Sequence, residues 1–498
     1  MKHIQKIALF LAGSFLLSSC SKDDDRDDSG TISTDVAVQD FVWKGMNSWY
    51  YWQKDVPMLA DAVQNNTKDY QNLLKGKKPD ELFYSLLYNY PTTDRYSWIV
   101  ENVDDLLQSF SGVSKSSGFD FTAFYKDTGN TNLVAIVNYV IPNSPADKAG
   151  VKRGDVISSV NGGTLTVNNY LKLLDEQFSF TVSENVEVTT SGIVTSGNQK
   201  SISIQSVTIE ENPVAFYKTL SYDAKKVGYL VYNGFQSNYN DELNDAFGKM
   251  KQEGVTDLVL DLRYNGGGSV ASAIALGQMI TGQFTGKNFV SMEFNSKHSQ
   301  YSSMDKLTEK VPIYNFVNGQ NQKSGEQNAN SLNLTKVYVL TSSGTASASE
   351  LTISGLDPYI DVVTIGGETY GKFVGSITLF DDPKSDFTDY ENRNKAHKWA
   401  MQPITFAYYN ANKDPHPAKG IVPNFPVNSY SYFGTLKEFG NPSDPALSKA
   451  LELIVGRKVG KMVSPITAFE KEKSFVNSSK TLKRYGTEVY IEGFKAKN

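Results

Sequence analysis

The chain has 498 residues, a formal net charge of −5, 40% hydrophobic residues and 21% charged residues. It is too long for a single hydrophobic core, so about three domains are expected. The acidic balance argues against nucleic acid as a partner, and the composition is ordinary for a folded globular protein.

The N-terminus has the pattern of a targeting segment. Lys2 and Lys6 give a basic start, and residues 7–17 form a mostly apolar run that is too short to cross a bilayer as a mature helix. Residues 17–20 (LSSC) resemble a bacterial lipobox, which implies a signal peptide at 1–19 and a lipid on Cys20; the alternative is an ordinary signal with a chance cysteine. Cys20 is the only cysteine, so the mature chain has no disulfide and no cysteine metal site.

Residues 20–33 are predicted to be an acidic tether, because a run such as KDDDRDD cannot pack into a core. An acidic run after a lipidated cysteine also resembles the surface-export signal of some Gram-negative lipoproteins, and a plain tether remains the alternative. No later run of 18 apolar residues exists. The lipid is therefore the only predicted membrane anchor, and the expected location is the outer membrane of a bacterial cell envelope, facing the periplasm or the cell surface.

Residues 34–110 read as a helical region, because apolar residues recur at helical spacing from Val42 to Tyr50 and from Leu82 to Leu87. A helical bundle packed on the main core of the protein is expected, and a groove lined by its aromatic residues is the alternative. The break at Pro91 ends the pattern. Residues 94–98 (DRYSW) resemble the point where a known multidomain family passes from such a helical region toward its next domain.

Residues 111–208 resemble a PDZ domain, chiefly in residues 144–157 (SPADKAGVKRGDVI) and the Asn-Gly-Gly turn that follows at 161–163. Residues 183–208 are expected to form strands on either side of residues 195–198 (TSGN). The resemblance implies that Ser117, Gly118, Phe119 and Asp120 form a loop whose N–H groups hold a peptide carboxylate, and that a bound peptide adds a strand to residues 119–125. A PDZ fold that only packs on its neighbour is the alternative.

Residues 209–457 carry two turns suited to catalysis. In the first, the apolar strand at 258–262 runs into residues 261–268 (DLRYNGGG), and a helix of small and apolar residues follows through Ile280. Consecutive glycines free backbone N–H groups to point at a ligand oxygen. A phosphate-binding loop would require a lysine directly after the glycines, whereas Ser269 and Val270 stand there.

The second turn follows the apolar strand at 337–340 and ends in Ser347, where a helix is predicted to begin. A strand, a tight turn and a helix start expose a hydroxyl beside N–H groups that can hold an oxyanion. The strand at 361–365 then leads through glycines to Lys372, 25 residues after Ser347.

These turns resemble those of the C-terminal processing peptidases, also called tail-specific proteases. The family signatures are matched by SASE at 347–350, by GGETYGK at 366–372, where Gly367 replaces the usual glutamate, and by the DLR-type glycine turn. The resemblance implies that Ser347 is the nucleophile, that Lys372 is the general base, and that Gly267 and Ala348 form the oxyanion hole. It also implies a multidomain α/β (α+β) fold, with an N-terminal helical region, a PDZ-like β domain and a crotonase-like catalytic core.

A lysine amine in water is mostly protonated at neutral pH, so a lysine base needs a buried site. The apolar residues Phe373, Val374 and Ile365 are consistent with such a site, and no histidine lies in a signature turn. The family orients its lysine with a glutamine four residues later, where this chain has Ser376. Ser376 is the candidate third catalytic residue, although a hydroxyl has a shorter reach.

The predicted function is a lipid-anchored serine endopeptidase that captures protein C-terminal tails through its PDZ domain and cleaves them through an acyl-enzyme. The expected partners are proteins or peptides with accessible tails, and no cofactor, metal or nucleic acid is expected. The alternatives are a catalytically impaired relative that binds peptides or apolar ligands at the surface, and a docking scaffold.

Three segments carry no assigned function. Residues 283–334 are interpreted as a polar insertion without a core pattern, residues 381–397 as a charged loop, and residues 458–498 as a tail without an assigned role.

Overall fold

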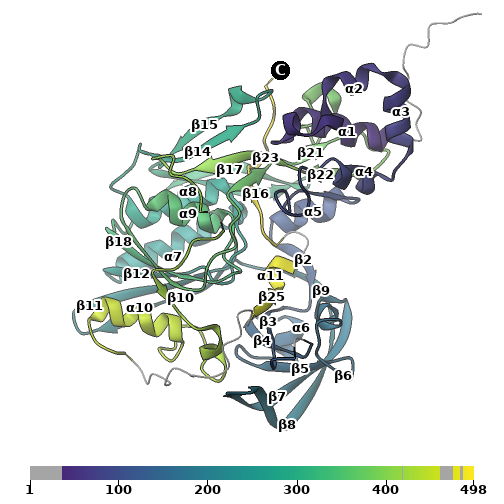
Figure 1. The fold of residues 1–498 in the computed structure, drawn as a ribbon. Coiled ribbons are helices and arrows are strands. Elements are labelled where there is room, and N and C mark those ends of the chain that lie inside the picture. Colours follow the sequence, from purple (N-terminus) through teal and green to yellow (C-terminus); the bar gives the residue numbers. More distant parts are fainter. Residues whose placement is uncertain (1–35, 130, 418, 460–474, 483–485, 498) are drawn as a thin grey trace, which may run out of the picture.

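The computed structural model describes residues 36–129, 131–417, 419–459, 475–482 and 486–497 (Figure 1). The predicted signal peptide, Cys20 and the acidic tether lie outside these residues. Within them, no helix is both long enough and apolar enough to span a bilayer.

The N-terminal region is helical, as its spacing of apolar residues predicts. Trp43, Met46 and Trp49 are fully buried on one face of the first helix. The elements of this region are α1 (Ala37–Trp49), α2 (Asp61–Asn65), α3 (Thr67–Lys75), α4 (Pro79–Ser85), β1 (Trp98–Val100) and α5 (Val103–Phe110).

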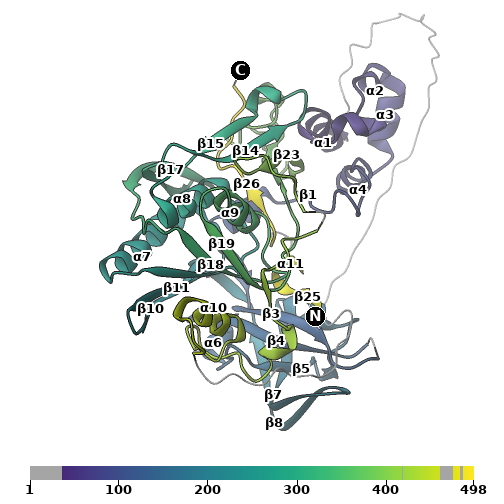
Figure 2. The same cartoon turned by 60° about the vertical axis from the view of Figure 1, so that its left-hand side comes forward.

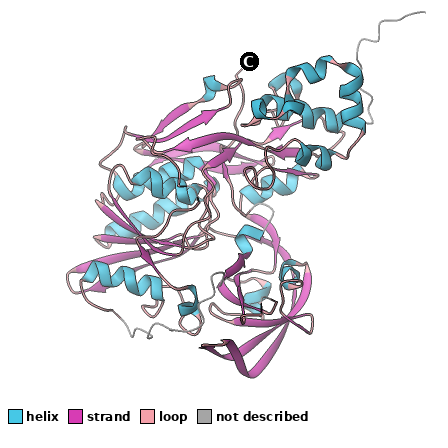
Figure 3. Cartoon of the chain, viewed as in Figure 1, coloured by secondary structure: helices cyan, strands magenta, loops and turns pink. Residues whose placement is uncertain are grey.

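The next region is nearly all strand, in contrast to the helices on either side of it (Figure 3). One sheet has the order β25-β3-β4-β5-β7-β8, with β6 on β5, and β2 pairs with β9. The elements are β2 (Val113–Ser116), β3 (Phe119–Tyr125), β4 (Leu133–Val140), α6 (Pro145–Lys148), β5 (Val156–Val160), β6 (Gly163–Thr164), β7 (Gln177–Thr189), β8 (Gly192–Gln205), β9 (Val207–Glu210) and, from the C-terminus, β25 (Phe475–Ser478).

The centre of the strands expected over residues 183–208 was predicted wrongly. The strands β7 and β8 meet at residues 190–191, and residues 195–198 lie inside β8. The tip of this hairpin is largely polar, so the sequence pattern alone does not fix its register.

The third region, residues 209–457, contains a mostly parallel sheet with the order β10-β11-β12-β18-β19-β24. Side chains alternate across this sheet: Leu258 and Leu260 pack toward one group of helices, whereas Val259 packs toward α10 on the other face. The elements are β10 (Val214–Tyr222), β11 (Lys225–Tyr232), β12 (Asp257–Asp261), β18 (Lys336–Thr341), β19 (Asp361–Gly366), β24 (Phe425–Pro426), α7 (Asn240–Gln252), α8 (Val270–Thr281), α9 (Ala348–Leu356) and α10 (Pro445–Val455).

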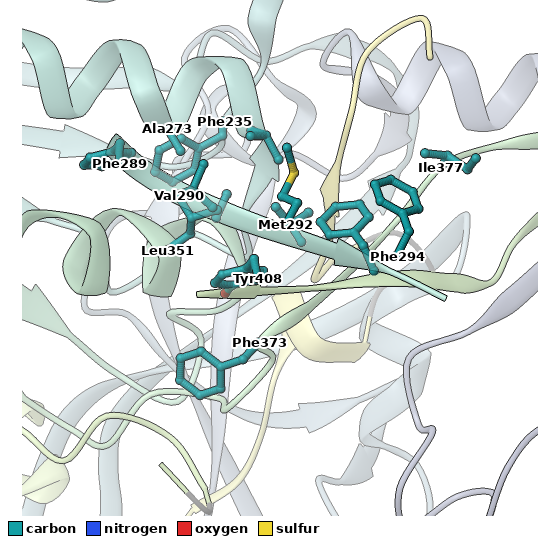
Figure 4. Close-up of a cluster of buried hydrophobic side chains, with 14 of the residues drawn as sticks. Phe235, Ala273, Phe289, Val290, Met292, Phe294, Leu351, Phe373, Ile377 and Tyr408 are labelled. Atoms are coloured by element: carbon teal, nitrogen blue, oxygen red, sulfur yellow. The ribbon is translucent and has the colours of Figure 1, made fainter. Parts of the chain in front are cut away.

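A second sheet covers the helices α8 and α9, so both helices are buried between two sheets. Figure 4 shows Ala273 of α8 and Leu351 of α9 facing Phe289 and Val290 of β14, with Tyr408 of β23 beside them. The order of this sheet is β13-β26-β20-β23-β14-β15. Its strands are β13 (Gly268–Ser269), β26 (Val489–Tyr490), β20 (Val374–Ser376), β23 (Ile404–Tyr409), β14 (Asn288–Phe294) and β15 (Ser303–Lys306).

The interpretation of residues 283–334 as a polar insertion without a core pattern was wrong. Phe289, Val290 and Met292 of β14 are buried in the main core, because one face of this short strand packs on α8 and α9. A single buried strand among polar neighbours gives too short a pattern to recognise.

The remaining strands and α-helix are β16 (Lys310–Val317), β17 (Gln320–Asn328), β21 (Leu379–Phe380), β22 (Ala400–Gln402) and α11 (Ser479–Leu482).

The C-terminal segment, defined here as residues 475–482 and 486–497, has a definite place in the fold. Its strand β25 joins the PDZ-like sheet, and its strand β26 lies in the second sheet of the core (Figure 2). The segment therefore links two regions that are far apart in the sequence, although no pattern in the sequence predicts this role.

Candidate active site

Ser347 occupies the turn between β18 and α9, immediately before the first helical residue. Its backbone has φ 63° and ψ −114°, a strained conformation for a residue with a side chain. The residue is fully buried, and its Oγ has no hydrogen-bond partner among the described residues. Strain and an unpaired buried hydroxyl are both costly, so they mark Ser347 as a candidate functional residue.

One buried carboxylate ties the turn of Ser347 to the turn of Lys372. Glu350 Oε2 accepts hydrogen bonds from the backbone N–H of Ser347 at 2.8 Å and of Lys372 at 2.9 Å. Glu350 Oε1 accepts from the N–H of Gly371 at 2.7 Å and from the hydroxyl of Thr369. Burial raises the pKa of Glu350, and these donors oppose the rise. The carboxylate fixes the relative position of the two turns.

Tyr408 of β23 braces the same two turns from the other side. Its hydroxyl lies 2.9 Å from the carbonyl oxygen of Ser347 and 2.8 Å from that of Lys372. The ring is fully buried in the core (Figure 4). Two independent groups therefore hold the backbone of the predicted nucleophile beside the backbone of the predicted base.

The amine of Lys372 is fully buried and contacts the C-terminal segment. Nζ donates to the carbonyl oxygen of Thr487 at 2.7 Å and forms an ion pair with Glu488 Oε2 at 3.1 Å. The ring centroid of Tyr96 lies 5.5 Å from Nζ. Because Ser347 Oγ has no described partner, the amine and the hydroxyl are not hydrogen-bonded to each other in this structure.

Ser376, the predicted third catalytic residue, lies in the same buried network. Gln402 Nε2 donates to Ser376 Oγ at 2.9 Å, and Ser376 Oγ lies 3.4 Å from Glu488 Oε2. Ser376 thus reaches Lys372 through the carboxylate of Glu488. The family signature places a glutamine four residues after the lysine. In this structure a buried glutamine amide comes instead from Gln402 on β22.

The two residues predicted to form an oxyanion hole lie side by side. A Cβ at Gly267 would stand 2.8 Å from Ser347 Cβ and 3.0 Å from the backbone nitrogen of Ala348, so this close approach requires glycine. The N–H of Gly267 donates to Asn265 Oδ1 at 2.9 Å. Its availability to a substrate therefore depends on release of the Asn265 side chain.

The predicted peptide-carboxylate loop leads into the strand β3. Gly118 has φ +89°, and its N–H donates to Ser116 Oγ at 3.1 Å. Ser117, Phe119 and Asp120 are buried. The carboxylate of Asp120 accepts hydrogen bonds from Asn138 and from the hydroxyl of Ser479, a residue of the C-terminal segment.

Residues near position 95 contact the active site in a way that the sequence did not reveal. Tyr96 donates its hydroxyl to the carbonyl oxygen of Gly371 at 2.8 Å, and the Trp98 indole N–H donates to Glu488 Oε1 at 2.7 Å. Both lie in the DRYSW segment, which was interpreted only as a domain transition. The density of aromatic residues there was the one available signal, and it could not indicate the partner.

The three histidines among the described residues are engaged elsewhere. His298 stacks on Trp49 with ring centroids 3.5 Å apart, and His416 stacks on Phe373. His397 Nε2 lies 3.0 Å from Asp381 Oδ2. With Ser347 Oγ unpartnered among the described residues, Lys372 remains the candidate base.

The Glu488 carboxylate, like the Thr487 carbonyl, comes to the site from the C-terminal segment. It is buried, and burial raises its pKa while Lys372 opposes that rise. A strained serine with an unpaired hydroxyl at a helix start is the arrangement of the nucleophile in serine hydrolases. The fold and site point to this class.

Comparisons with known proteins agree with that class. Residues 226–427 match the model of peptidase family S41, residues 37–98 match the S41 N-terminal domain, and residues 136–183 match a PDZ domain. The two S41 models together cover just over half of the chain. The chain belongs to peptidase family S41, and it has the predicted helical N-terminal region, PDZ domain and α/β core.

Individual relatives extend this result. A protein named "Probable CtpA-like serine protease" from Staphylococcus aureus is 27% identical over 326 residues, which cover 63% of this chain and 59% of the relative. One of the same name from Staphylococcus epidermidis is 27% identical over 265 residues, which cover 53% of this chain and 47% of the relative. The chain thus matches about half to three-fifths of the length of these relatives.

A solved structure covers more of the fold. The crystal structure of a Bacteroides fragilis protein assigned to the S41 proteases aligns with a TM-score of 0.63 at 27% identity. The alignment covers 84% of this chain and 97% of that protein. The predicted fold class is confirmed.

Proposed function

We propose that this protein is a serine endopeptidase of the C-terminal processing type. The single observation that carries the proposal is the bridge by Glu350, which holds the backbones of Ser347 and Lys372 on one buried carboxylate. Family membership supports it, since S41 is a peptidase family. The substrates would be proteins with accessible tails, which the PDZ domain would bind by adding a strand.

In the proposed reaction the neutral Lys372 amine accepts the proton of Ser347 Oγ while Oγ bonds to the scissile carbonyl carbon. The electron pair of the carbonyl moves to its oxygen, which the N–H groups at the start of α9 and in the glycine turn stabilise. When the C–N bond breaks, the lysine ammonium gives its proton to the leaving amine. Water then attacks the acyl ester with Lys372 again as base, and Ser347 Oγ leaves with that proton.

The test is cleavage of an unfolded protein with a free C-terminal tail by the wild type, Ser347→Ala and Lys372→Met. Only the wild type should cleave at a measurable rate, and labelling by a fluorophosphonate should depend on Ser347. Equal cleavage by the wild type and Ser347→Ala would overturn the proposal, because the activity would then come from elsewhere.

A second candidate function is a peptide-binding protein with little catalysis. The observation that favours it is the ion pair between Lys372 and Glu488, since an amine that keeps its proton cannot activate Ser347. This candidate predicts binding of tail peptides to the PDZ domain with no labelling of Ser347 in any variant of Glu488. Labelling in one of those variants would exclude it.

The proposed location is a bacterial outer membrane, through a lipid on Cys20. The LSSC motif and the acidic run after it support this. Expression in a Gram-negative host with a radiolabelled fatty acid should label the wild type and leave Cys20→Ser unlabelled, and only the wild type should sediment with membranes. Equal sedimentation of both proteins would contradict lipid anchoring.

A further inference from the structure

We propose that the C-terminal segment is an internal peptide ligand that occupies both the PDZ edge and the active site, and that a substrate tail must displace it. This inference rests on the proposed peptidase function and concerns the regulation of the same site. Three groups of contacts support it.

The first contacts lie on the PDZ-like sheet. The strand β25 pairs antiparallel with β3, with Asn477 opposite Ala123 and Ser478 opposite Thr122. The strand β3 is the edge to which a peptide ligand is predicted to add. The hydroxyl of Ser479 also accepts from the N–H of Phe121 at 3.1 Å. The segment therefore makes the main-chain pairing that a captured tail would make.

The second contacts lie on the glycine turn of the core. The strand β26 runs parallel to β13, where Gly268 pairs with Val489, and it touches β20 on its other side. The N–H of Gly268 donates to the carbonyl oxygen of Glu488. The segment thus places a peptide carbonyl on the N–H of Gly268, directly next to the predicted oxyanion-hole residue Gly267.

The close fit of this backbone depends on the absence of side chains in the turn. A Cβ at Gly266 would stand 1.6 Å from the carbonyl oxygen of Gly486, and a Cβ at Gly267 would stand 2.2 Å from that of Glu488. Two glycines of the signature turn therefore accommodate an extended peptide in this structure. That peptide is the chain's own C-terminal segment.

The third contacts involve the base. The Lys372 amine donates to Thr487 and pairs with Glu488, whose other oxygen accepts from Trp98. An ion pair keeps the proton on the amine, and a protonated amine cannot take the proton of Ser347. The segment therefore opposes catalysis in two ways, by occupying the turn and by holding the base in its protonated form.

The segment is anchored beyond the site. Beyond β26, the ring of Phe494 packs on Trp49 of α1 with centroids 5.4 Å apart and on Phe294 of β14 with centroids 5.9 Å apart. In Figures 1 and 2 the yellow segment passes along the core toward the N-terminal helices. Displacement can therefore begin at the short strand β26 while the end of the segment stays attached.

A cleft beside the segment gives an incoming peptide a route. It has a volume of about 770 Å³, and its lining includes Lys115, Gln236, Gly267 and Glu488. Its walls come from the strands β2 and β9 on one side and the glycine turn on the other. A second extended peptide could thus lie against the segment before replacing it.

The experiment compares labelling of Ser347 by a fluorophosphonate, and cleavage of a tail-bearing substrate, in the wild type and in Glu488→Gln. The glutamine keeps the shape of the side chain and an oxygen for Trp98 but removes the ion pair. We expect both rates to rise about tenfold, which is within the usual range of coupling between sites. The matched control is Glu492→Gln, which changes the same group in the same segment away from Lys372 and should leave both rates within about twofold.

Displacement is measured separately, in Ser347→Ala, by hydrogen–deuterium exchange. Adding an uncleaved tail peptide should increase exchange of residues 486–491. Unchanged or slower rates in a folded Glu488→Gln, or unchanged exchange at 486–491, would overturn the inference. If the wild type cleaves under the same conditions, the proposed function survives that result, whereas no cleavage or labelling in any variant would overturn the function itself.

Discussion

Two buried clusters of polar and charged groups lie against the same turn, residues 261–268. They differ in whether every member has a partner. In the arginine cluster, Arg263 pairs with Asp261 at 2.6 Å and with Asp444 at 2.8 Å, and Arg153 of the PDZ-like region pairs with Asp444 at 3.0 Å. Two positive and two negative groups are all paired. This cluster fastens the PDZ-like region to the core.

The active-site cluster, in contrast, leaves one group unpaired and takes one partner from a distant segment. Ser347 Oγ has no described partner, and Lys372 pairs with Glu488 of the C-terminal segment. A charge cluster that only stabilises the fold is expected to satisfy every member, since each unpaired buried group is costly. The difference is what the proposed displacement of the C-terminal segment requires of the second cluster.

The largest expected effect breaks the functional cluster alone. Ser347→Ala and Lys372→Met should each lower kcat/KM for peptide cleavage at least about 1,000-fold, because nucleophile and base act as a unit. Ser347→Ala should change the free energy of unfolding by less than about 1 kcal/mol, since its Oγ makes no described hydrogen bond. Cleavage assays and urea unfolding of the same preparations check both values. A strongly destabilised Ser347→Ala would argue against an unpaired hydroxyl.

The second prediction breaks the structural cluster. Asp444→Asn should lower the free energy of unfolding by about 3–5 kcal/mol, because it leaves Arg263 and Arg153 without their shared carboxylate. The catalytic rate of the molecules that remain folded should stay within about threefold. Urea unfolding followed by circular dichroism measures the free energy of unfolding. Active-site titration gives the concentration of folded enzyme, to which the catalytic rate is normalised. A loss of less than about 1 kcal/mol would show that the cluster is not essential to the fold.

The third prediction uses pH to isolate the same carboxylate. Burial alone would raise the pKa of Asp444, but Arg263 and Arg153 outweigh burial and hold that pKa below its usual value. A lowered folded-state pKa adds stability that is complete above the unfolded-state value, about 3.9, and is lost as the pH falls through the folded-state value. The stability difference between the wild type and Asp444→Asn should therefore be constant above about pH 5 and shrink below pH 4. Unfolding curves at several pH values test this, and a difference that grows in acid would contradict it.

The smallest expected effect concerns the support of Ser376. Gln402→Leu removes the hydrogen bond from Gln402 to Ser376 and should lower kcat about fivefold, the equivalent of about 1 kcal/mol. Thr378→Val is the matched control. The hydroxyl of Thr378 donates to Gln402 Oε1 at 2.8 Å, so it is one hydrogen bond further from Ser376 than Gln402 is. It should lower kcat by less than about twofold. Equal effects of both variants would mean that Gln402 acts through packing alone.

Much of the fold could be predicted where the sequence repeats a pattern over a whole element. The strand at 258–262, the helix after Gly268 and the strand at 337–340 correspond to β12, α8 and β18. The strand predicted at 119–125 is β3 with the same bounds. Single short strands in polar surroundings, such as β14, were missed because one element of seven residues gives too few repeats to distinguish from chance.

The sequence by itself determined the two turns, because glycine spacing, small residues and a strand before each turn are local properties. It also placed Ser347 and Lys372 at the ends of neighbouring strands, and the structure shows that Glu350 joins them. Only the tertiary structure decided which other groups meet the amine. Glu488 arrives from 116 residues away and Trp98 from a different domain, through contacts that no local pattern encodes. Long-range contacts depend on the summed packing of whole elements, which is why the C-terminal segment had no predicted role and yet contacts the Lys372 amine.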